Sequence, residues 1–336
     1  MRIMVTGGAG YIGSHTLIDL RAAGHAVHVV DTFANASPVA LDRVAELTGA
    51  PVPHDRVDIR DADALGRVFE AVRPDAVIHF AGLKAVGESA EKPLAYYDTN
   101  VGGTVALLGA MDRVGCRRIV FSSSATVYGE ADYLPFDEAH PLRPTNVYGH
   151  TKLVAEQVLR AWQAATPEAG VAVLRYFNPV GAHASGRIGE DPEGPPNNLM
   201  PFVAQVAGGR RDLVRVFGDD YDTPDGTGMR DYIHITDLAR AHTAALDHAA
   251  RGPGWEAFNI GTGESHSVLE MIAAFSRAAG REIPHEVVAR REGDIARSVA
   301  DPSKAQAALG WRAEHGLDEM CRSTWAWQAA NPEGYR

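Results

Sequence analysis

A glycine-rich turn near the start of the chain constrains its fold more than any other feature. The apolar run Arg2–Thr6 leads directly into Gly7-Gly8-Ala9-Gly10-Tyr11-Ile12-Gly13, after which a helical pattern begins. Glycines at 7, 10 and 13 let backbone N–H groups approach a pyrophosphate at the start of a helix. A tight turn without a ligand is the simpler interpretation. A strand before it and a helix after it nevertheless favour a dinucleotide site.

The second predicted strand, Ala26–Asp31, ends in an acidic residue. Asp31 lies eighteen residues after Gly13, about where a carboxylate accepts hydrogen bonds from an adenosine ribose. A carboxylate there would repel a 2′-phosphate, so the sequence favours NAD over NADP. Asp also caps turns, but beside the glycine turn the ribose role is the better interpretation. Asp58, after a third predicted strand, is expected near the adenine.

The first half of the chain alternates short apolar strands with longer helical patterns. The predicted strands are Arg2–Thr6, Ala26–Asp31, Asp55–Ile59, Ala76–Phe80, Arg118–Ser122 and Val171–Arg175. The predicted helices are Ile12–Ala23, Ala62–Ala71, Val101–Val114 and Tyr148–Ala165. Short strands that are apolar on both faces and separated by helices predict an α/β fold with a doubly wound parallel sheet of the Rossmann type.

After about Asn178 this rhythm changes. Two loop-like stretches, Gly189–Pro201 and Gly218–Gly228, are rich in Pro, Gly, Asn and Asp, and helical patterns then dominate, as in Ile235–Ala249 and Ser267–Ala279. We therefore expect an NAD-binding domain over residues 1–178 and a smaller C-terminal substrate lobe over residues 179–336. The boundaries are approximate, and some interleaving is expected.

Composition narrows the classes of ligand and the location. A net charge of −11 without a basic run argues against nucleic acid, whereas a small anionic ligand is compatible with it. The fourteen histidines show no metal-binding spacing, so no metal site is expected. Cys116 and Cys321 do not make a disulfide framework. With neither a signal peptide nor an apolar stretch of membrane length, we expect a cytoplasmic protein that does not insert into membranes.

Tyr148 and Lys152 form the pattern that points to catalysis. Their four-residue spacing at the start of a predicted helix places both side chains on one face. A tyrosine is a poor base at neutral pH, and a neighbouring ammonium stabilises its phenolate and lowers its pKa. Ser124, at the end of a serine-rich strand, can relay a proton from a substrate hydroxyl. Tyr-x-x-x-Lys alone is a common surface pattern, but together with the glycine turn it predicts a catalytic set.

Further stretches make the chain similar to a known family. They are His79–Ser89, Arg175–His183, Pro196–Pro201 and Arg290–Asp294. With the glycine turn, they resemble the UDP-glucose 4-epimerase family of the extended short-chain dehydrogenases/reductases over essentially the whole chain. The resemblance implies interconversion of UDP-glucose and UDP-galactose through transient oxidation at sugar C4, with tightly bound NAD. It also implies a homodimer.

The resemblance further implies which residues act. Ser124, Tyr148 and Lys152 would be catalytic. The implied cofactor contacts are Gly7, Gly10, Tyr11, Ile12, Gly13, Asp31, Thr32, Asn35, Asp58, Ile59, Phe80, Ala81, Lys84, Thr99, Ser124, Tyr148, Lys152 and Phe177. The implied substrate contacts are Lys84, Ser124, Tyr148, Asn178, Asn198, Leu199, Phe217, Arg230, Arg291, Asp294 and Ser298. Planar guanidinium groups such as those of Arg230 and Arg291 suit a pyrophosphate, and Phe217 can face the uracil ring.

Three positions depart from the family pattern. Thr32 and Thr99 stand where asparagines are frequent near the cofactor, and we expect tuned affinity there with binding retained. Ser298 stands where related epimerases carry a bulky tyrosine. The smaller side chain would leave room for a 2-N-acetyl group, so UDP-N-acetylglucosamine and UDP-N-acetylgalactosamine are also expected substrates. Arg297 or Val299 could instead fill the vacated volume.

Other functions share some of these features. A nucleotide-sugar 4,6-dehydratase begins with the same oxidation but carries an acidic pair after the catalytic hydroxyl, where this chain has Ala125 and Thr126. A non-catalytic NAD sensor on the same fold would typically lose the tyrosine or the lysine, and both are present here. Epimerisation of UDP-pentoses or UDP-uronates is left open by the sequence.

Overall fold

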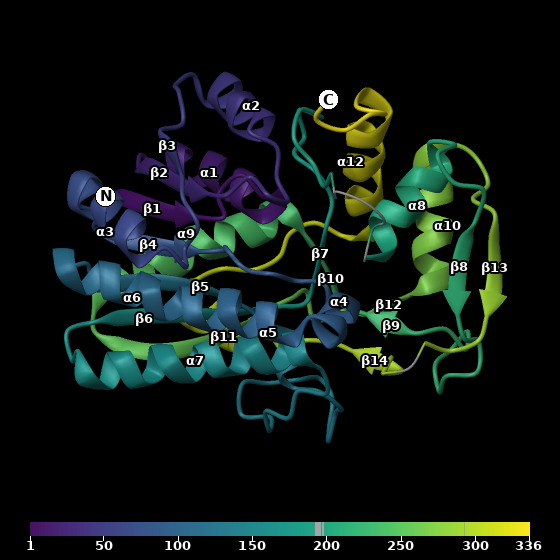
Figure 1. Ribbon diagram of the computed structural model, residues 1–336. Helices are drawn as coiled ribbons and strands as arrows, with labels where there is room; N and C mark the ends of the chain where they lie inside the picture. Colours follow the sequence, from purple (N-terminus) through teal and green to yellow (C-terminus); the bar gives the residue numbers. More distant parts are fainter. Residues whose placement is uncertain (192–195, 197, 292) are drawn as a thin grey trace.

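A parallel sheet of seven strands forms the larger of two lobes in the computed structural model, which describes residues 1–191, 196, 198–291 and 293–336 (Figure 1). The strand order is β11-β6-β5-β4-β1-β2-β3, with every neighbouring pair parallel. The strands are β1 (Arg2–Thr6), β2 (Ala26–Asp31), β3 (His54–Arg56), β4 (Ala76–His79), β5 (Arg118–Ser124), β6 (Gly170–Tyr176) and β11 (Gly254–Ile260). This confirms the predicted doubly wound α/β class.

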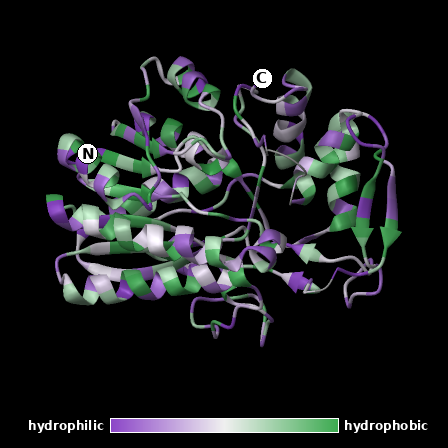
Figure 2. Ribbon diagram, viewed as in Figure 1, coloured by the Kyte–Doolittle hydropathy of each residue, from purple (hydrophilic) through white to green (hydrophobic). Residues whose placement is uncertain are grey.

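Helices cover both faces of this sheet. One face is covered by α1 (Tyr11–Ala22), α2 (Val39–Thr48) and α9 (Ile235–Arg251), and the other by α3 (Ala62–Val72), α6 (Gly103–Val114) and α7 (Val147–Ala165). In β1, Ile3 and Val5 join the apolar cluster on the first face, whereas Met4 joins that on the second. All three are buried, as expected for a strand covered on both sides. Figure 2 shows the corresponding hydrophobic colour on the central strands.

The smaller lobe packs its own core beside the carboxyl ends of the strands (Figure 1). Its helices are α8 (Leu199–Ala207), α10 (Val268–Ala279) and α12 (Leu317–Ala330), and its strands include the parallel pair β8 (Val214–Phe217) and β13 (His285–Val288). A small sheet of β12 (His266–Ser267), β9 (Met229–Arg230) and β14 (Arg297–Ser298) faces the larger lobe. The pair β7 (Asn178–Val180) and β10 (Tyr232–His234) connects the two lobes.

The lobes interleave along the chain. Helix α9 and strand β11 follow β8, yet both pack on the large sheet, where β11 pairs with β6 over its whole length. Residues 179–336 therefore contain part of the first lobe as well as the second. Neither α2 nor β11 was among the predicted elements.

Predicted boundaries differ most at two elements. Strand β3 begins one residue earlier and is shorter than the predicted Asp55–Ile59, and its side chains are exposed or half-buried at the sheet edge. The predicted helix from Val101 is preceded by α4 (Val86–Glu91), α5 (Pro93–Tyr96) and the π-helical turn η1 (Tyr97–Gly102). Among the described residues, no helix has the length and apolarity of a membrane span.

Candidate functional site

The glycine turn lies where the strand order reverses, between the carboxyl ends of β1 and β4. A Cβ at Gly7 would lie 2.6 Å from the backbone nitrogen of Ala81, and φ there is +70°, so glycine is required. A Cβ at Gly13 would lie 2.6 Å from the carbonyl oxygen of Gly7. Gly10 caps α1 without a side-chain hydrogen bond, which leaves first-turn N–H groups open to an anion. This cradle fits the pyrophosphate of NAD.

Asp31 stands beside this turn, at the end of β2. Its Oδ2 accepts a hydrogen bond from the backbone N–H of Ala9 at 3.0 Å, and its Oδ1 accepts one from Phe33 at 2.9 Å. Burial raises the pKa of Asp31, and these hydrogen bonds act in the opposite direction. The carboxylate is thus fixed over the glycine turn, where an adenosine ribose would lie. Thr32 is half-buried and Asn35 exposed on the following loop.

An ion-pair network lies on the side where the adenine is predicted. Asp58 accepts hydrogen bonds from the guanidinium of Arg60, with a shortest distance of 2.7 Å, and Arg60 also contacts Asp98 at 2.8 Å. The Arg60 contacts hold the pKa of Asp58 below its usual value. Ile59 is buried against Gly103. Arg60 was not predicted, because nothing in its local sequence distinguishes it from surface charge.

The segment after β4 brings Phe80, Ala81 and Lys84 to the same edge. Asn100 fixes it: its Oδ1 accepts from the N–H of Leu83 at 2.8 Å, and its Nδ2 donates to the carbonyl oxygen of Leu83 at 3.0 Å. Asn100 is buried, whereas the predicted neighbour Thr99 is half-buried. Sequence reasoning missed Asn100, because the π-helical turn that aims it carries no recognisable local signal.

The three proposed catalytic residues meet at the carboxyl ends of β5 and β6. Ser124 ends β5, and its Oγ accepts hydrogen bonds from the N–H and hydroxyl of Thr126 at 3.2 and 2.9 Å. Asn146 caps α7 by accepting from the N–H of Gly149, which starts the helix directly before Tyr148. Lys152 lies one turn later. Its Nζ donates to the Ser122 carbonyl oxygen at 2.7 Å and lies 5.9 Å from the Tyr148 ring centroid.

Burial controls the ionisation of this set. It raises the pKa of Tyr148 to about 12, against the effect of a hydrogen bond with Ser124. It lowers the pKa of Lys152 to about 8, against the attraction of Glu156. We expected the ammonium to lower the tyrosine pKa. Here the cost of burying a phenolate is the larger effect, because Lys152 turns its charge toward Ser122.

A second polar group gathers in the smaller lobe. Asp294 accepts from the Arg291 guanidinium at 2.8 Å and lies 3.8 Å from Arg230. The Arg291 guanidinium lies 5.6 Å from the ring centroid of Phe217, whose side chain is 41% exposed. Ser298 pairs in register with Arg230 across β14 and β9, so both side chains share one face. The structure therefore brings five of the predicted substrate contacts together.

The remaining predicted contacts lie between the two groups. Phe177 is buried directly after β6, and Asn178 begins β7. Asn198 caps α8 without a hydrogen bond to its backbone, and Leu199 is the first residue of that helix. Asn197 and Glu292 of the motifs cited above lie outside the described residues. Lys84 lies 3.6 Å from Glu190, a residue that the sequence reasoning did not select. Burial raises the pKa of Glu190, while Lys84 and Asn198 oppose this rise.

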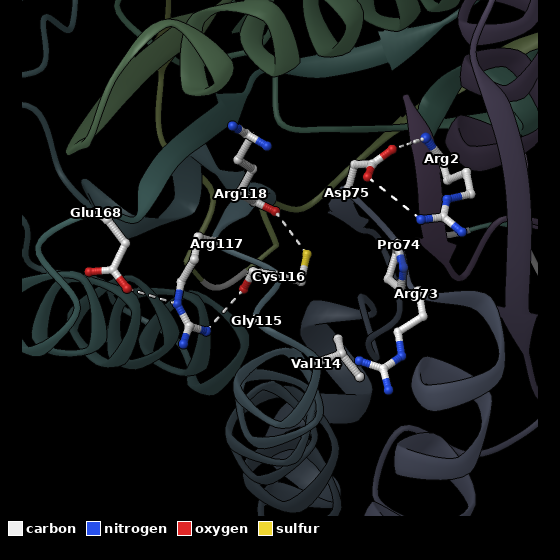
Figure 3. Close-up of a pocket in the computed structure, with 10 residues that line it drawn as sticks. All are labelled: Arg2, Arg73, Pro74, Asp75, Val114, Gly115, Cys116, Arg117, Arg118 and Glu168. Carbon is white, nitrogen blue, oxygen red and sulfur yellow. Dashed lines mark hydrogen bonds and ion pairs between the residues drawn. The ribbon is translucent and has the colours of Figure 1, made fainter.

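A cavity of about 420 Å³ opens at the other end of the sheet, near the amino ends of the strands (Figure 3). Arg73 lines it at the C-terminal end of α3, and Arg117 lies just beyond the C-terminal end of α6. The negative end of a helix dipole stabilises cations at such positions. Arg117 is already paired with Asp112 and Glu168. None of the predicted site residues reaches this cavity. Among the described residues, no cluster of three or more potential metal ligands occurs.

Comparisons with known proteins agree with the geometry. A family model described as GDP-mannose 4,6 dehydratase matches residues 4–324. The UDP-glucose 4-epimerase of Bacillus subtilis is 54% identical over 336 residues, which cover 100% of this chain and 99% of the relative. The human UDP-glucose 4-epimerase is 54% identical over 99% of this chain and 98% of its own length. A crystal structure of the Bifidobacterium longum UDP-glucose 4-epimerase in complex with NAD+ and UDP superposes with a TM-score of 0.96 at 52% identity, covering 99% of this chain and 100% of that one.

Proposed function

The chain belongs to the GDP-mannose 4,6 dehydratase family and, within it, to the UDP-glucose 4-epimerases, and from this premise we infer that it interconverts UDP-glucose and UDP-galactose. The observation that carries this conclusion is full-length identity above one half to epimerases from bacteria and animals. The cofactor is NAD, which is bound in several similar structures. When bound, NAD supplies a two-electron acceptor and donor for C4 of the sugar.

We propose that Tyr148, Ser124 and Lys152 handle the proton of the sugar 4-hydroxyl. Tyr148 takes this proton on its phenolate oxygen and later returns it from the phenol, and Ser124, which opposes the rise in the pKa of Tyr148, relays the transfer. A phenolate next to the Lys152 ammonium costs less than an isolated one, because opposite charges stabilise each other in a site of low dielectric. The set thus serves as a reversible base whose two protonation states are both used in one cycle.

Residues of the smaller lobe are proposed to hold the UDP group while the sugar turns. Arg230 and Arg291 both hold guanidinium groups near the Asp294 carboxylate, at 3.8 and 2.8 Å, with Phe217 beside Arg291. Such forks pair with phosphate oxygens at two points, and an exposed aromatic ring can stack on uracil. Anchoring at UDP leaves the 4-keto sugar free to present its opposite face, so epimerisation needs no release of the intermediate.

Ser298 supports a wider substrate range. It is 8% exposed and faces the same side of the small sheet as Arg230. The adjoining Arg297 is directed to the surface, where its Nε donates to Ser265, and Val299 is buried. We propose that the protein also epimerises the UDP-N-acetylhexosamine pair. A structure of the Campylobacter jejuni UDP-Glc/GlcNAc 4-epimerase is similar, with a TM-score of 0.86 at 36% identity.

The dehydratase alternative lacks its acid–base pair. Ala125 has no titratable group, and the hydroxyl and N–H of Thr126 both donate to Ser124. Neither residue can protonate a leaving hydroxyl or abstract a C5 proton.

We also propose a cytoplasmic homodimer. Large hydrophobic residues are exposed on three consecutive elements, with Leu94 83% exposed: Leu94 of α5, Tyr97 of η1 and Val105 of α6. Apolar side chains gathered on a surface are characteristic of an interface. Two free, buried cysteines suit a reducing compartment. Light scattering should give twice the chain mass of 36.0 kDa; a monomer at working concentration would contradict the dimer.

One experiment tests the proposed function. The protein is purified without added cofactor. One portion is heated to release any bound nucleotide, and other, unheated portions are incubated with UDP-glucose, a UDP-pentose or a UDP-uronate. We expect bound NAD(H), UDP-galactose as the product and no accumulation of NADH. Sustained NADH formation would indicate a dehydrogenase, and a 4-keto-6-deoxy product would indicate a dehydratase.

A separate experiment tests the role of Asp31. In cofactor-stripped protein NADP should restore little activity, because Asp31 repels its 2′-phosphate. Equal activity with NAD and NADP would refute that role.

A further inference from the structure

A buried polar network lies one helical turn beyond Lys152, on the face of α7 that carries the proposed catalytic residues. Glu156 follows Tyr148 and Lys152 at the same four-residue spacing, so the three side chains share one face of the helix. The Glu156 side chain is only 2% exposed. Its Oε1 accepts a hydrogen bond from the hydroxyl of Ser123 at 2.5 Å. Since Ser123 precedes Ser124 in β5, this bond joins the helix to the strand that carries the third catalytic candidate.

Arg175 of β6 pairs with the same carboxylate at two points. Its Nη2 donates to Oε2 of Glu156 at 2.7 Å, and its Nε donates to Oε1 at 3.1 Å. Its Nη1 also donates to the Tyr128 hydroxyl at 3.1 Å, and Tyr128 donates to Asn259 of β11 at 2.6 Å. The network therefore links α7 to β5, β6 and β11, three adjoining strands of the sheet.

Stability alone does not account for a buried ion pair here. Apolar replacements of such pairs are often neutral or stabilising, because two charges must be taken out of water. The location supplies another reason. Lys152 is 6% exposed, and burial lowers its pKa to about 8, whereas the charge of Glu156 raises it.

Other groups around Lys152 do not replace this charge. Those that face it or its hydrogen-bond partner come from β4, η1, β5, β6 and α7. They are His79, Asn100, Ser122, Tyr176 and Tyr148. Arg175 of β6 instead pairs with the Glu156 carboxylate. Burial lowers the pKa of His79 to about 3, so that ring is neutral near pH 7. Among the residues that the structure describes, Glu156 supplies the carboxylate that acts on Lys152.

We propose that Glu156 is a positioning residue that keeps Lys152 in its ammonium form at neutral pH and ties α7 to the strand bearing Ser124. The inference rests on the proposed function, because the ammonium matters to epimerisation through the phenolate of Tyr148. Glu156 is enclosed by Ser123, Arg175 and the helix, so it acts through Lys152 and not on the substrate.

The chain offers a direct measurement. It contains four lysines, Lys84, Lys92, Lys152 and Lys304, so carbon-13 labelling of the lysine ε-carbon gives four signals to titrate by NMR in the holoenzyme. The signal lost in Lys152→Met belongs to Lys152. Three variants are compared with the wild type. Glu156→Gln removes the charge at similar size, Glu156→Asp keeps the charge, and Tyr128→Phe removes a hydrogen bond to Arg175 without changing charge.

Only the loss of the carboxylate should move the lysine. In Glu156→Gln we expect the pKa of Lys152 to fall by about one unit, as loss of a nearby opposite charge produces. The ratio of turnover at pH 8 to turnover at pH 6.5 should then fall about fourfold, because the ammonium form is lost at lower pH. Glu156→Asp and Tyr128→Phe should leave both quantities near the wild-type values, although Tyr128→Phe should lower the melting temperature.

Two outcomes would overturn the proposal. One is an unmoved Lys152 titration in Glu156→Gln, and the other is an equal shift in Tyr128→Phe, which would mark the network as structural. If Glu156→Gln does not fold, the double variant Glu156→Gln/Arg175→Met is compared with Arg175→Met alone. The difference in the pKa of Lys152 between these two variants isolates the carboxylate, and equal titrations would overturn the proposal. A wild type that epimerises no UDP-sugar would contradict the proposed function, while the titration would still decide the role of Glu156.

Discussion

Burial disfavours the charged forms of two of the proposed catalytic residues. Tyr148 is proposed as a base although burial raises its pKa to about 12, and Lys152 is proposed as a cation although burial lowers its pKa to about 8. Both shifts mean that the Tyr148 phenolate and the Lys152 ammonium are each unfavourable in the site without ligands. The pair is therefore poised so that charge on one residue becomes favourable when charge forms on the other.

Replacement of Tyr148 by phenylalanine tests the proposed base. The change deletes the phenol oxygen and almost no surface, so UDP-sugar should bind with little change in affinity. Turnover should fall by about 10²–10⁴-fold, the range typical of removing a general base. Steady-state kinetics and calorimetric binding of UDP measure the two quantities. Near-normal turnover would remove Tyr148 from the mechanism.

Ser298 provides a steric test on the opposite side of the site. In Ser298→Tyr we expect activity on UDP-N-acetylglucosamine and UDP-N-acetylgalactosamine to drop steeply, because overfilling a packed wall costs about 1–3 kcal/mol or more. Activity on UDP-glucose should change little. Coupled assays on all four sugars make the comparison. If the wild type does not use the acetylated sugars, or the tyrosine variant uses them equally, Ser298 does not control access.

Residues selected from the sequence share a recognisable local pattern, and those missed do not. Gly7, Asp31 and Tyr148 stand at fixed distances from a strand end or a helix start, and the parallel strands bring these positions to one edge of the sheet. Asn100 and Glu156 are defined by partners far away in sequence, such as Leu83 and Arg175. Such pairings depend on the assembled sheet, so spacing could not reveal them.

The position of helix α1 against β1 depends on the glycines at and just before its start. The helix begins against β1 with no side chain between them, and Gly13 faces the carbonyl oxygen of Gly7. The helix can approach the strand this closely only without a Cβ. The same close approach lets its N–H groups point toward the cofactor cradle.

Gly13→Ala should separate α1 from the turn. The added methyl group would lie 2.6 Å from Gly7 O and 2.7 Å from the Gly8 Cα, both backbone atoms that cannot rotate away. We expect the purified variant to carry much less NAD(H), which is measured after heat release. Gly109→Ala is the matched control, since it lies within α6 with open space around it. That control should keep its cofactor and gain up to about 1 kcal/mol of stability.

Helices and strands were predicted best where the pattern of apolar residues in the sequence is clear. Strands β1 and β2 have the predicted bounds, because their mostly apolar runs end next to clear turn residues. Strand β11 was missed, since Glu256 and Asn259 break its apolar run and its first three residues are only half-buried. Its role becomes clear only from pairing with β6.

At the scale of the whole molecule, the large sheet needs residues from both halves of the chain. Helix α9 and strand β11 contribute buried residues such as Leu238, Leu246 and Phe258 to the core that packs on β1. A fragment of residues 1–178 should therefore fail to fold stably, although it contains six of the seven strands. Circular dichroism and NAD binding of the fragment test this. A cooperative, NAD-binding fragment would show that the first domain is independent of α9 and β11.

The late position of β11 also has a consequence during synthesis. Until the ribosome has added about eighty residues beyond β6, that strand has an open edge and one face of the sheet lacks α9. At typical elongation rates the nascent chain stays in this state for on the order of ten seconds. An open apolar strand edge readily pairs with other chains. The interleaved topology thus leaves this strand edge open to other chains and to chaperones during translation until β11 has been synthesised.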